Sequence, residues 1–574
     1  MNHWSLEALV PAYGWLGAYR REDLRRDLSA GLAVVVVLVP QGMAYAVLAG
    51  LPPVHGLYAS TGPAVVYALF GTSRHMPVGP PALMALLTFT GVSAVAEPGS
   101  GEYIAYALLL ALMAGALQLA LGLLRMGFVT NFIPRPVLSG FVYASAIIIV
   151  LAQAGSFLGI PVSGEESPLG TVAELSGSVG ETNPFALAIG ATGVVALVLL
   201  AKKFPRLPGS LLVAAGCAVA VYGLGLDGRG VEVVGGVPGG LPGFSVPPLD
   251  PGALRALAPA AVAVALVGFV ESISVARAVA AREKYKIDSD AELRALGLAN
   301  VCAGFLSGMP VAGSFSRTAV QYQSGARTQM ASVVSAAGIL LTLLFLTPLF
   351  YYLPDAALAA IVVVAVYGLL DFGEARRVFG VSRTDGYAML LTFALTLLVG
   401  VEEGIIAGSL FALLAFVRRT AYPEVTELGY VPRKNAFLGL RSYSEARTYP
   451  EAIIVRFDAR LYYANVPFLE EWLIEAVADR PRLRWIVIDC RGVNGIDVTA
   501  VEGLESLVSG YRSDGIRVVL THAKLQVRER LESAGWPDKF GDLLYPTTRD
   551  ALRDIGLLER RPPRSEPAEP LQPS

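Results

Sequence analysis

Apolar residues dominate the chain from about Leu28 to Val417, where short polar breaks separate one apolar stretch from the next. About 20 mainly apolar residues are enough for a helix to cross a bilayer. We therefore predict an α-helical polytopic membrane region over 27–420, preceded by a cytoplasmic segment over 1–26. Counting between the polar breaks gives about fourteen spans. The clearest spans, each with its flanks, are Ile104–Leu124, Val137–Ala154, Ala186–Ala201, Ala258–Val270, Ala331–Leu349 and Ala388–Val399.

The pattern changes at about Val425, where short apolar runs begin to alternate with amphipathic stretches. The runs Ala452–Phe457, Trp485–Cys490 and Val518–Thr521 indicate buried strands, and the 3.6-residue period predicts helices over Asn465–Ala478 and Thr499–Tyr511. Alternating strands and helices are typical of a small α/β domain. We place this domain at 425–558 and predict that the tail over 559–574, rich in Pro, Glu and Ser, is disordered.

Composition supports a membrane protein, since 54% of the residues are apolar and only 16% are charged, against roughly a quarter charged in soluble domains. Lys and Arg cluster in every second loop, and basic loops favour the cytoplasmic side. We expect the protein to lie in the plasma membrane. Because the number of spans is even, we expect both termini and the α/β domain on the cytoplasmic side. The three cysteines have no metal-ligand spacing. Because no nucleophile–base pair, metal constellation or phosphate loop is present, we expect no enzyme, no cofactor, no metal site and no nucleic-acid partner.

Two apolar segments are interrupted by Gly, Pro and small polar residues: Gly71–Ala85 and Gly304–Ser324. Each places a short extended piece, Pro77–Gly79 or Pro310–Gly313, before a helix of half length. The first half-helix is expected to begin near Pro80 and Pro81, and the second near the capping residues Ser314 and Ser316. Backbone left unpaired in lipid is costly. A pair of broken spans at matching places in two halves therefore points to a transporter binding site.

Two helix N-termini that meet inside the membrane present free amides to one cavity, and this favours negative charge. Arg317, in the first turn of the second half-helix, would add a full positive charge. The site is therefore expected to take an anion. The alternative is that the glycines and prolines are ordinary helix kinks and that Arg317 extends to the membrane interface.

Three motifs resemble those of the SulP family of anion transporters, the sulfate-permease family: Pro40–Ser60, Gly71–Leu87 and Gly313–Thr328. The resemblance covers nearly the whole chain, including a C-terminal STAS domain. It implies fourteen spans in two inverted seven-span repeats, divided into core and gate domains, and a homodimer. It also implies the residues that bind the anion: Gln41, Tyr45, Pro80, Pro81, Ala82, Ser314, Ser316 and Arg317. Tyr45 stands where some relatives carry Phe.

Glu271 is an ionisable residue inside the predicted eighth span, and such a residue is a functional candidate by default. We hypothesise that it couples anion transport to a proton, with Ser272 and Ser274 as supporting polar groups. In the family an acidic residue here accompanies either proton coupling or sodium coordination. The alternative is that Glu271 only neutralises Arg317 as a buried ion pair.

The leading interpretation is a secondary transporter of a small anion across the lipid bilayer, with sulfate favoured by the resemblance and proton symport through Glu271. Bicarbonate, dicarboxylates such as fumarate, and chloride stay open, as do sodium coupling, exchange, an uncoupled channel and a sensor. The STAS segment Val493–Leu504 resembles the loop that is phosphorylated in anti-sigma-factor antagonists, which would put the hydroxyl at Thr499. We expect instead that Asp497 or Thr499 caps the following helix, and that the domain serves dimer contacts or regulation.

Overall fold

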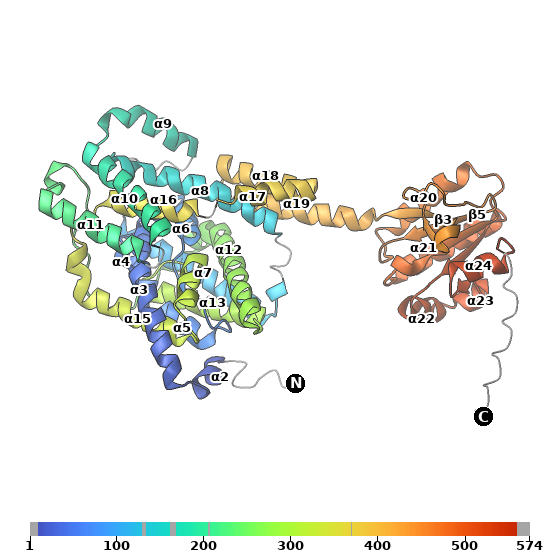
Figure 1. The fold of residues 1–574 in the computed structure, drawn as a ribbon, viewed down its shortest axis with the longest axis horizontal. Coiled ribbons are helices and arrows are strands. Elements are labelled where there is room, and N and C mark those ends of the chain that lie inside the picture. The colour runs from blue at the N-terminus through green and yellow to red at the C-terminus, as the bar shows by residue number, and fades with distance from the viewer. Residues whose placement is uncertain (1–9, 129–133, 161–167, 205–206, 369, 559–574) are drawn as a thin grey trace, which may run out of the picture. The chain divides into compact units, whose positions relative to one another are not determined.

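The computed structural model describes residues 10–128, 134–160, 168–204, 207–368 and 370–558. The predicted disorder of 559–574 therefore falls outside the described residues. The chain divides into two compact units, Met1–Ala412 and Leu413–Ser574. The first is a bundle of helices and the second a sheet covered by helices (Figure 1).

Unit 1 is built from helices, the longer of which follow the predicted spans, and its last helix continues past Ala412 into unit 2. In chain order they are α2 (Ala12–Gly17), α3 (Arg21–Leu48), α4 (Val54–Tyr58), α5 (Gly62–Phe70), α6 (Ala82–Ser93), α7 (Gly101–Leu123), α8 (Arg135–Leu158), α9 (Pro168–Ser178), α10 (Pro184–Lys203), α11 (Gly209–Leu224), α12 (Pro251–Glu283), α13 (Ser289–Phe305), α14 (Phe315–Gln323), α15 (Met330–Leu341), α16 (Asp355–Tyr367), α17 (Phe372–Val381), α18 (Arg383–Leu398) and α19 (Val401–Ala421). Within the described ranges, 7 helices are long and apolar enough to cross a membrane.

The structure adds detail to two predicted spans, which lie within the candidate spans Pro251–Glu283 and Met330–Phe350. The stretch predicted as Ala258–Val270 belongs to α12, which runs for 33 residues and carries Pro259 inside it. The stretch predicted as Ala331–Leu349 is α-helical only to Leu341 and continues as π-helix and then as 3₁₀-helix. An apolar run shows where a span lies, but it does not show where α-helical hydrogen bonding changes to π- or 3₁₀-helix within that span.

The order of the elements follows the expected repeat. A first series runs α3, α5, α6, α7, α8, α10 and α11, and a second runs α12, α13, α14, α15, α16, α18 and α19. In each series a two-residue strand comes just before the third helix: β1 (Val78–Gly79) before α6 and β2 (Ala312–Gly313) before α14. The two breaks in the apolar pattern therefore occupy matching positions in the two series, as predicted.

Helix contacts sort unit 1 into two groups, which fits the expected core and gate. In the first group α7 packs against α12 and α13, α3 against α14 and α15, and α6 against α12. In the second group α8 packs against α16 and α18, and α10 against α11 and α16. Helix α19 packs closely against α18, as shown by Gly404, where an added Cβ atom would collide with Thr396. Both broken spans belong to the first group.

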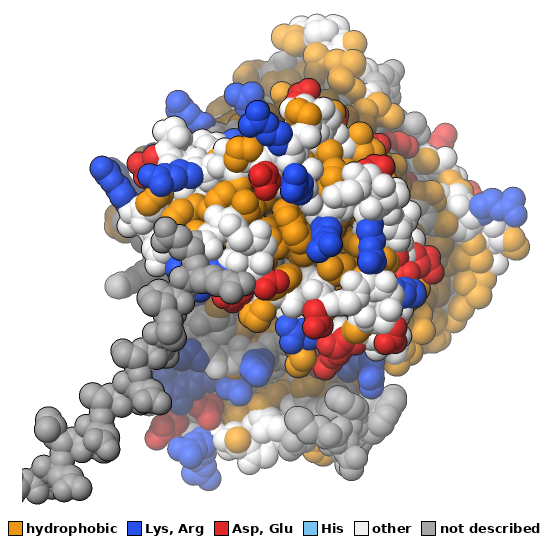
Figure 2. Space-filling model, turned by 90° about the vertical axis from the view of Figure 1, so that its right-hand side faces the viewer, with side chains coloured by type: hydrophobic (Ala, Val, Ile, Leu, Met, Phe, Trp, Pro, Cys, Tyr) orange, Lys and Arg blue, Asp and Glu red, His pale blue; other side chains and the backbone are white. Residues whose placement is uncertain are grey.

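Unit 2 contains a six-stranded sheet in the order β4-β3-β5-β6-β7-β8, in which β5 to β8 are parallel and β3 and β4 antiparallel. Its strands are β3 (Val425–Val431), β4 (Ala436–Gly439), β5 (Ala452–Phe457), β6 (Trp485–Asp489), β7 (Arg517–Thr521) and β8 (Leu544–Tyr545), and its helices are α20 (Val466–Ala478), α21 (Val498–Ser513), α22 (Leu525–Ser533), α23 (Trp536–Phe540) and α24 (Thr548–Asp554). Charged and apolar side chains are interspersed on the face nearest the viewer in Figure 2, which belongs to this unit.

Three strands and two helices of unit 2 were predicted, whereas β3, β4 and β8 were not. β4 and β8 are short edge strands with little apolar signal of their own, and β3, an inner strand of 7 residues, mixes apolar with polar residues in the sequence VTELGYV. The predicted cap is resolved in favour of Asp497, whose carboxylate accepts from the amide of Ala500 at 2.8 Å. Thr499 lies inside the first turn of α21 and is not the cap.

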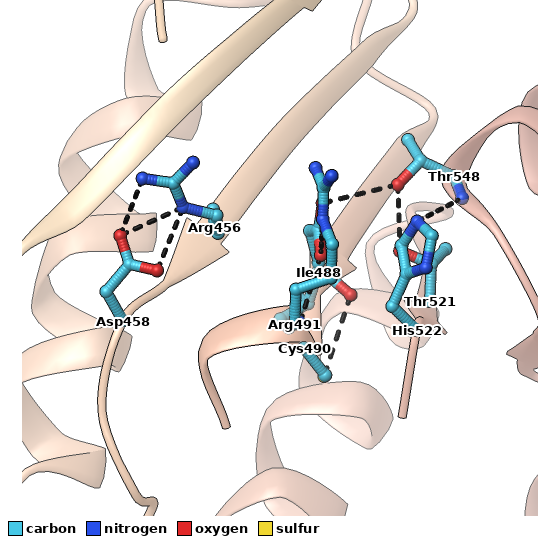
Figure 3. A network of polar contacts seen from close by, with 9 residues as sticks. Arg456, Asp458, Ile488, Cys490, Arg491, Thr521, His522 and Thr548 are labelled. Atoms are coloured by element: carbon cyan, nitrogen blue, oxygen red, sulfur yellow. Dashed lines mark hydrogen bonds and ion pairs between the residues drawn. The ribbon is translucent and has the colours of Figure 1, made fainter. Parts of the chain in front are cut away.

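The carboxyl ends of the parallel strands are joined by polar contacts (Figure 3). The buried carboxylate of Asp489 accepts from the amide, Nε and terminal guanidinium nitrogen of Arg491. The hydroxyls of Thr521 and Thr548 lie 3.0 Å apart, and the Thr548 amide donates to Nε2 of His522 at 3.3 Å. These contacts fasten α24 to the ends of β6 and β7.

Candidate anion site in the membrane unit

The two broken spans meet in a short antiparallel ladder. Val78 pairs with Gly313, and Gly79 pairs with Ala312. Helix α6 begins three residues after Gly79 and α14 two residues after Gly313, so the starts of both half-helices are fixed beside the ladder. Gly313 also lets the buried Met76 pack closely on the ladder, because a Cβ atom at 313 would lie 2.2 Å from Sδ of Met76.

Arg317 holds the two breaks together. Its side chain is 1% exposed. One terminal nitrogen donates to the Pro80 carbonyl at 2.6 Å, and the other donates to the carbonyls of Gly79 at 3.0 Å and Ala312 at 3.2 Å. Its Nε–H is buried and has no partner within the described part of the chain. The guanidinium thus keeps donors and its positive charge for a ligand after it has joined the two segments.

The half-helices leave their first backbone amides free of intrahelical bonds, as every helix start does. Ser314 occupies the N-cap position of α14, as predicted, but its side chain makes no capping hydrogen bond. Its Oγ lies 3.2 Å from Oγ of Ser316 instead. At α6 the cap position belongs to Pro81, which has no side-chain donor or acceptor, and Ala82 is the first helical residue. Amides at both starts can therefore donate to an anion.

Helix α3 presents Gln41 and Tyr45 on one face, four residues apart. Leu38 lies one turn before them, and its Cδ1 is 3.7 Å from a Cβ position at Gly79, so this face meets β1. Gln41 and Tyr45 are 8% and 5% exposed. The Oε1 atom of Gln41 has no hydrogen-bond partner among the described residues. The predicted pair is thus brought to the side of the ladder.

Helix α12 presents Gly268, Glu271 and Ser272 on one face. A Cβ atom at Gly268 would lie 3.1 Å from Sδ of Met84 in α6. Ser272 accepts from the amide of Gly313 at 2.8 Å and donates to the Gly268 carbonyl at 2.6 Å. Ser272 therefore fastens α12 to β2, and Glu271 lies on the same face.

The Glu271 carboxylate is buried, and its Oε2 has no hydrogen-bond partner in the described ranges. No ion pair within 4.0 Å joins it to Arg317 among the residues that the structure describes. Ser274 donates to the carbonyl of Val270 at 2.6 Å and is only partly buried. The Glu271 side chain is thus the part of this face that is left available for a proton or a cation.

Three residues that fasten the broken segments were missed by sequence reasoning. Asn300 of α13 accepts from the Val311 amide at 2.8 Å and donates to the Val311 carbonyl at 3.0 Å. Gln118 of α7 accepts from Asn300 and donates to a carbonyl of α12. Gln329 donates to the carbonyls of Ser73 and Met76 ahead of β1. The sequence shows these residues as isolated amide side chains in apolar segments, but it does not show which groups they bond.

The groups gathered here are of the kind that can favour a negative charge. Two helix starts and one arginine lie beside the β1–β2 ladder. Small residues there allow a ligand to approach the backbone amides closely. Within the described ranges, no group of three or more His, Cys, Asp or Glu residues could hold a metal ion. A polytopic helical bundle with paired broken spans around a polar centre is the architecture of a membrane transporter.

The chain belongs to the sulfate permease family, whose family model matches residues 24–392, and a STAS domain model matches residues 443–551. It is 34% identical over 569 residues to the chloroplastic sulfate transporter 4.1 of Arabidopsis thaliana, covering 96% of this chain and 82% of that protein. It is 35% identical over 491 residues to solute carrier family 26 member 6 of Homo sapiens, covering 81% and 64%. The members of this family are transporters and not enzymes.

Solved structures share the fold. The chain superposes on murine solute carrier 26 family member A9, an anion transporter in its inward-facing state, with a TM-score of 0.88 and 23% identity over 96% of each chain. It superposes on the transmembrane domain of the cyanobacterial bicarbonate transporter BicA with a TM-score of 0.60 and 23% identity, covering 69% of this chain and 98% of that one. The protein is thus a multi-pass helical membrane protein with a C-terminal STAS domain.

Proposed function

We propose that this protein is a secondary active transporter of sulfate or a related small oxyanion, and that it couples anion movement to a proton through Glu271. The observation that carries the proposal is the β1–β2 ladder with Arg317 across it. This ladder fixes two helix starts and one positive charge around a single point, and such a point favours an anion.

The proposed anion site comprises Gln41 and Tyr45 from α3, Pro81 and Ala82 at α6, and Ser314, Ser316 and Arg317 at α14. Small residues at 82 and 314 let an oxyanion approach the backbone amides. Sulfate is the first candidate because sulfate transporters are among the similar proteins. Gln41 and the serines offer neutral hydrogen bonds, which suits a ligand that has to leave again.

The proposed coupling rests on the state of Glu271. A buried carboxylate that forms no ion pair within 4.0 Å in the described ranges is costly in its charged form. Protonation removes that cost, and the arriving anion and the proton then enter the site with a smaller net charge than the anion alone. Ser272 and Ser274 would supply acceptor oxygens beside it. Sodium could replace the proton in this role, so sodium coupling is the alternative that the experiment has to separate.

The test is uptake of radiolabelled sulfate, bicarbonate and fumarate by proteoliposomes that contain the full chain. An inward proton gradient and an inward sodium gradient are imposed in turn. We expect proton-driven sulfate uptake by the wild type. Glu271→Gln should abolish the dependence on the gradient, and Arg317→Ala should abolish uptake.

Glu403→Gln is the matched control, because it neutralises an exposed glutamate of unit 1 that lies on α19 and not at the ladder. It should retain gradient-driven uptake. Sulfate uptake by Glu271→Gln that still follows the proton gradient would contradict the coupling role. Uptake that ignores both gradients in the wild type would favour an exchanger or a channel, and preference for bicarbonate or fumarate would reassign the cargo.

We also propose that two copies associate in the plasma membrane and that both termini lie on its cytoplasmic side. The basic loops support this orientation. Light scattering of the purified protein gives the number of copies, and labelling of single cysteines introduced near residue 20 and residue 550 in intact cells reports their side. If an impermeant reagent labels either position in intact cells, the proposed orientation is wrong.

A further inference from the structure

An open pocket of about 610 Å³ lies at one end of unit 1, and its lining includes none of the residues proposed for the anion site. It is formed where α7 ends, α12 ends and α13 begins, next to the loop between α5 and β1. Three cationic side chains line it: Arg125, Arg277 and Lys286. Pockets of several hundred Å³ are sized for organic ligands and not for a bare tetrahedral oxyanion.

The two acidic side chains of the same pocket keep their negative charges, so the lining has three cations against two anions, but both carboxylates accept from backbone amides. Asp288 caps α13 and accepts from the amides of Asp290 and Ala291 at 2.9 and 3.1 Å. Asp290 accepts from the amide of Gly127 at 2.8 Å. Within the described residues, neither carboxylate forms an ion pair within 4.0 Å with a cation of the pocket.

The cations, in contrast, are available. Arg277 makes one hydrogen bond, to Oγ of Ser289 at 2.7 Å. The side chains of Arg125 and Lys286 have no hydrogen bond or ion pair in the part of the chain that the structure describes. Arg125 also lies at φ 59°, in the left-handed region where glycine is the usual residue after a helix.

The pocket is connected to the first broken span. Thr72, which lines it, accepts from the amide of Asp288 at 3.4 Å and donates to Glu292 at 2.6 Å. The buried carboxylate of Glu292 also accepts from Tyr67 and from the amides of Thr72 and Ser73. The segment that leads into β1 is therefore held from the wall of this pocket.

We propose that the pocket between α7, α12 and α13 binds a phosphate-bearing anion, either the headgroup of an anionic phospholipid or a soluble phosphate ester. Phosphate oxygens accept from Arg and Lys with charge-assisted hydrogen bonds, and three cations can surround one headgroup. Helix ends near a membrane surface are where a headgroup is within reach. The site is distinct from the anion site at the ladder, and its test needs no transport.

Native mass spectrometry of the purified full-length protein tests the lipid source, with phosphatidylglycerol and phosphatidylcholine added at equal concentration. Equilibrium dialysis with glycerol 3-phosphate and with inorganic phosphate tests the soluble source. We expect wild type to retain phosphatidylglycerol over phosphatidylcholine, or to bind glycerol 3-phosphate. Arg125→Gln/Lys286→Gln should weaken that binding about tenfold or more, since each lost contact is charge-assisted.

Two further variants keep the result interpretable. Arg125→Gly removes one cation and relieves the left-handed backbone, so it should bind more weakly while the protein stays folded. Arg282→Gln/Lys284→Gln removes the same charge as the double variant from neighbouring exposed positions outside the pocket lining, and it should bind like wild type. Equal loss in this control would assign retention to the general charge of this end of the protein and would overturn the proposal. Failure of wild type to bind any of these probes would also overturn it.

Discussion

The two units hold their extended segments in different ways. In unit 2 each central strand is bonded on both sides by other strands, so that the sheet satisfies its own backbone. In unit 1 the ladder has only two residues on each side, and the surrounding carbonyls and amides are satisfied by side chains from distant helices. Inside a bilayer water cannot provide these bonds. One arginine or one asparagine therefore does in unit 1 what a neighbouring strand does in unit 2.

This difference predicts that single side chains matter much more to the ladder than to the sheet. Hydrogen exchange followed by mass spectrometry reports local opening in the full-length protein, and it compares the segments around β2 and β5 in one sample. The predictions below are ordered from the largest expected effect to the smallest.

Arg317→Met should have the largest effect. It removes the donors to the carbonyls of Gly79, Pro80 and Ala312, and a buried acceptor left without a donor costs roughly 1–3 kcal/mol. Exchange should rise sharply around 309–314, and anion uptake should be lost. Arg456→Met on β5 is the control, because Arg456 bonds to Asp458 and the strand keeps its own ladder. If both variants open their segments equally, the comparison between the units is wrong.

Asn300→Leu should have the next largest effect. The amide of Asn300 both donates to and accepts from Val311, so an apolar residue of similar size leaves a buried amide and a buried carbonyl without partners. We expect the local stability around Val311 to fall by on the order of 2–3 kcal/mol. Amide exchange of Val311 should therefore be faster, and anion binding should be weaker. Asn300→Asp keeps the acceptor and should fall between wild type and Asn300→Leu. Unchanged exchange in Asn300→Leu would show that β2 does not depend on this contact.

Asp497→Ala should have a smaller effect, in unit 2. The substitution removes the cap of α21 and a second bond to the amide of Tyr463, and loss of a cap costs about 1 kcal/mol. Exchange should rise in the first turn of α21 and leave β6 protected. Thr499→Val should leave this turn unchanged, since Thr499 is not the cap. A larger effect from Thr499→Val would reverse the assignment.

The smallest expected effect is at Cys490, whose thiol should barely react with an alkylating reagent in the folded protein. Its burial, with the nearby Asp489 carboxylate as a second cause, raises the pKa of the thiol to about 12. The thiolate is the reactive form, so alkylation at pH 8 should be slower than for an exposed cysteine by on the order of a thousandfold. The rate should climb as pH rises toward that pKa and on unfolding. Rapid labelling of the peptide that contains Cys490 at pH 8 would contradict the burial.

The sequence by itself determined the class of this protein and the location of its centre. Apolar stretches of bilayer length defined the membrane region, and the change of period near Val425 defined the α/β domain. Gly, Pro and Ser in otherwise apolar segments revealed both breaks, because those residues alter local backbone preference wherever they occur. Such local signals survive without knowledge of the partner.

Only the tertiary structure decided how the centre is joined. Arg317 was expected to add a positive charge for the anion, and its terminal nitrogens also bond three carbonyls of the two breaks. Ser272 was expected to support a coupling ion, and it also bonds the amide of Gly313. Asn300, Gln118 and Gln329 were not singled out at all. Their roles depend on which distant carbonyl or amide lies opposite, and a hydrogen bond has a direction and a length that residue spacing along one chain does not encode.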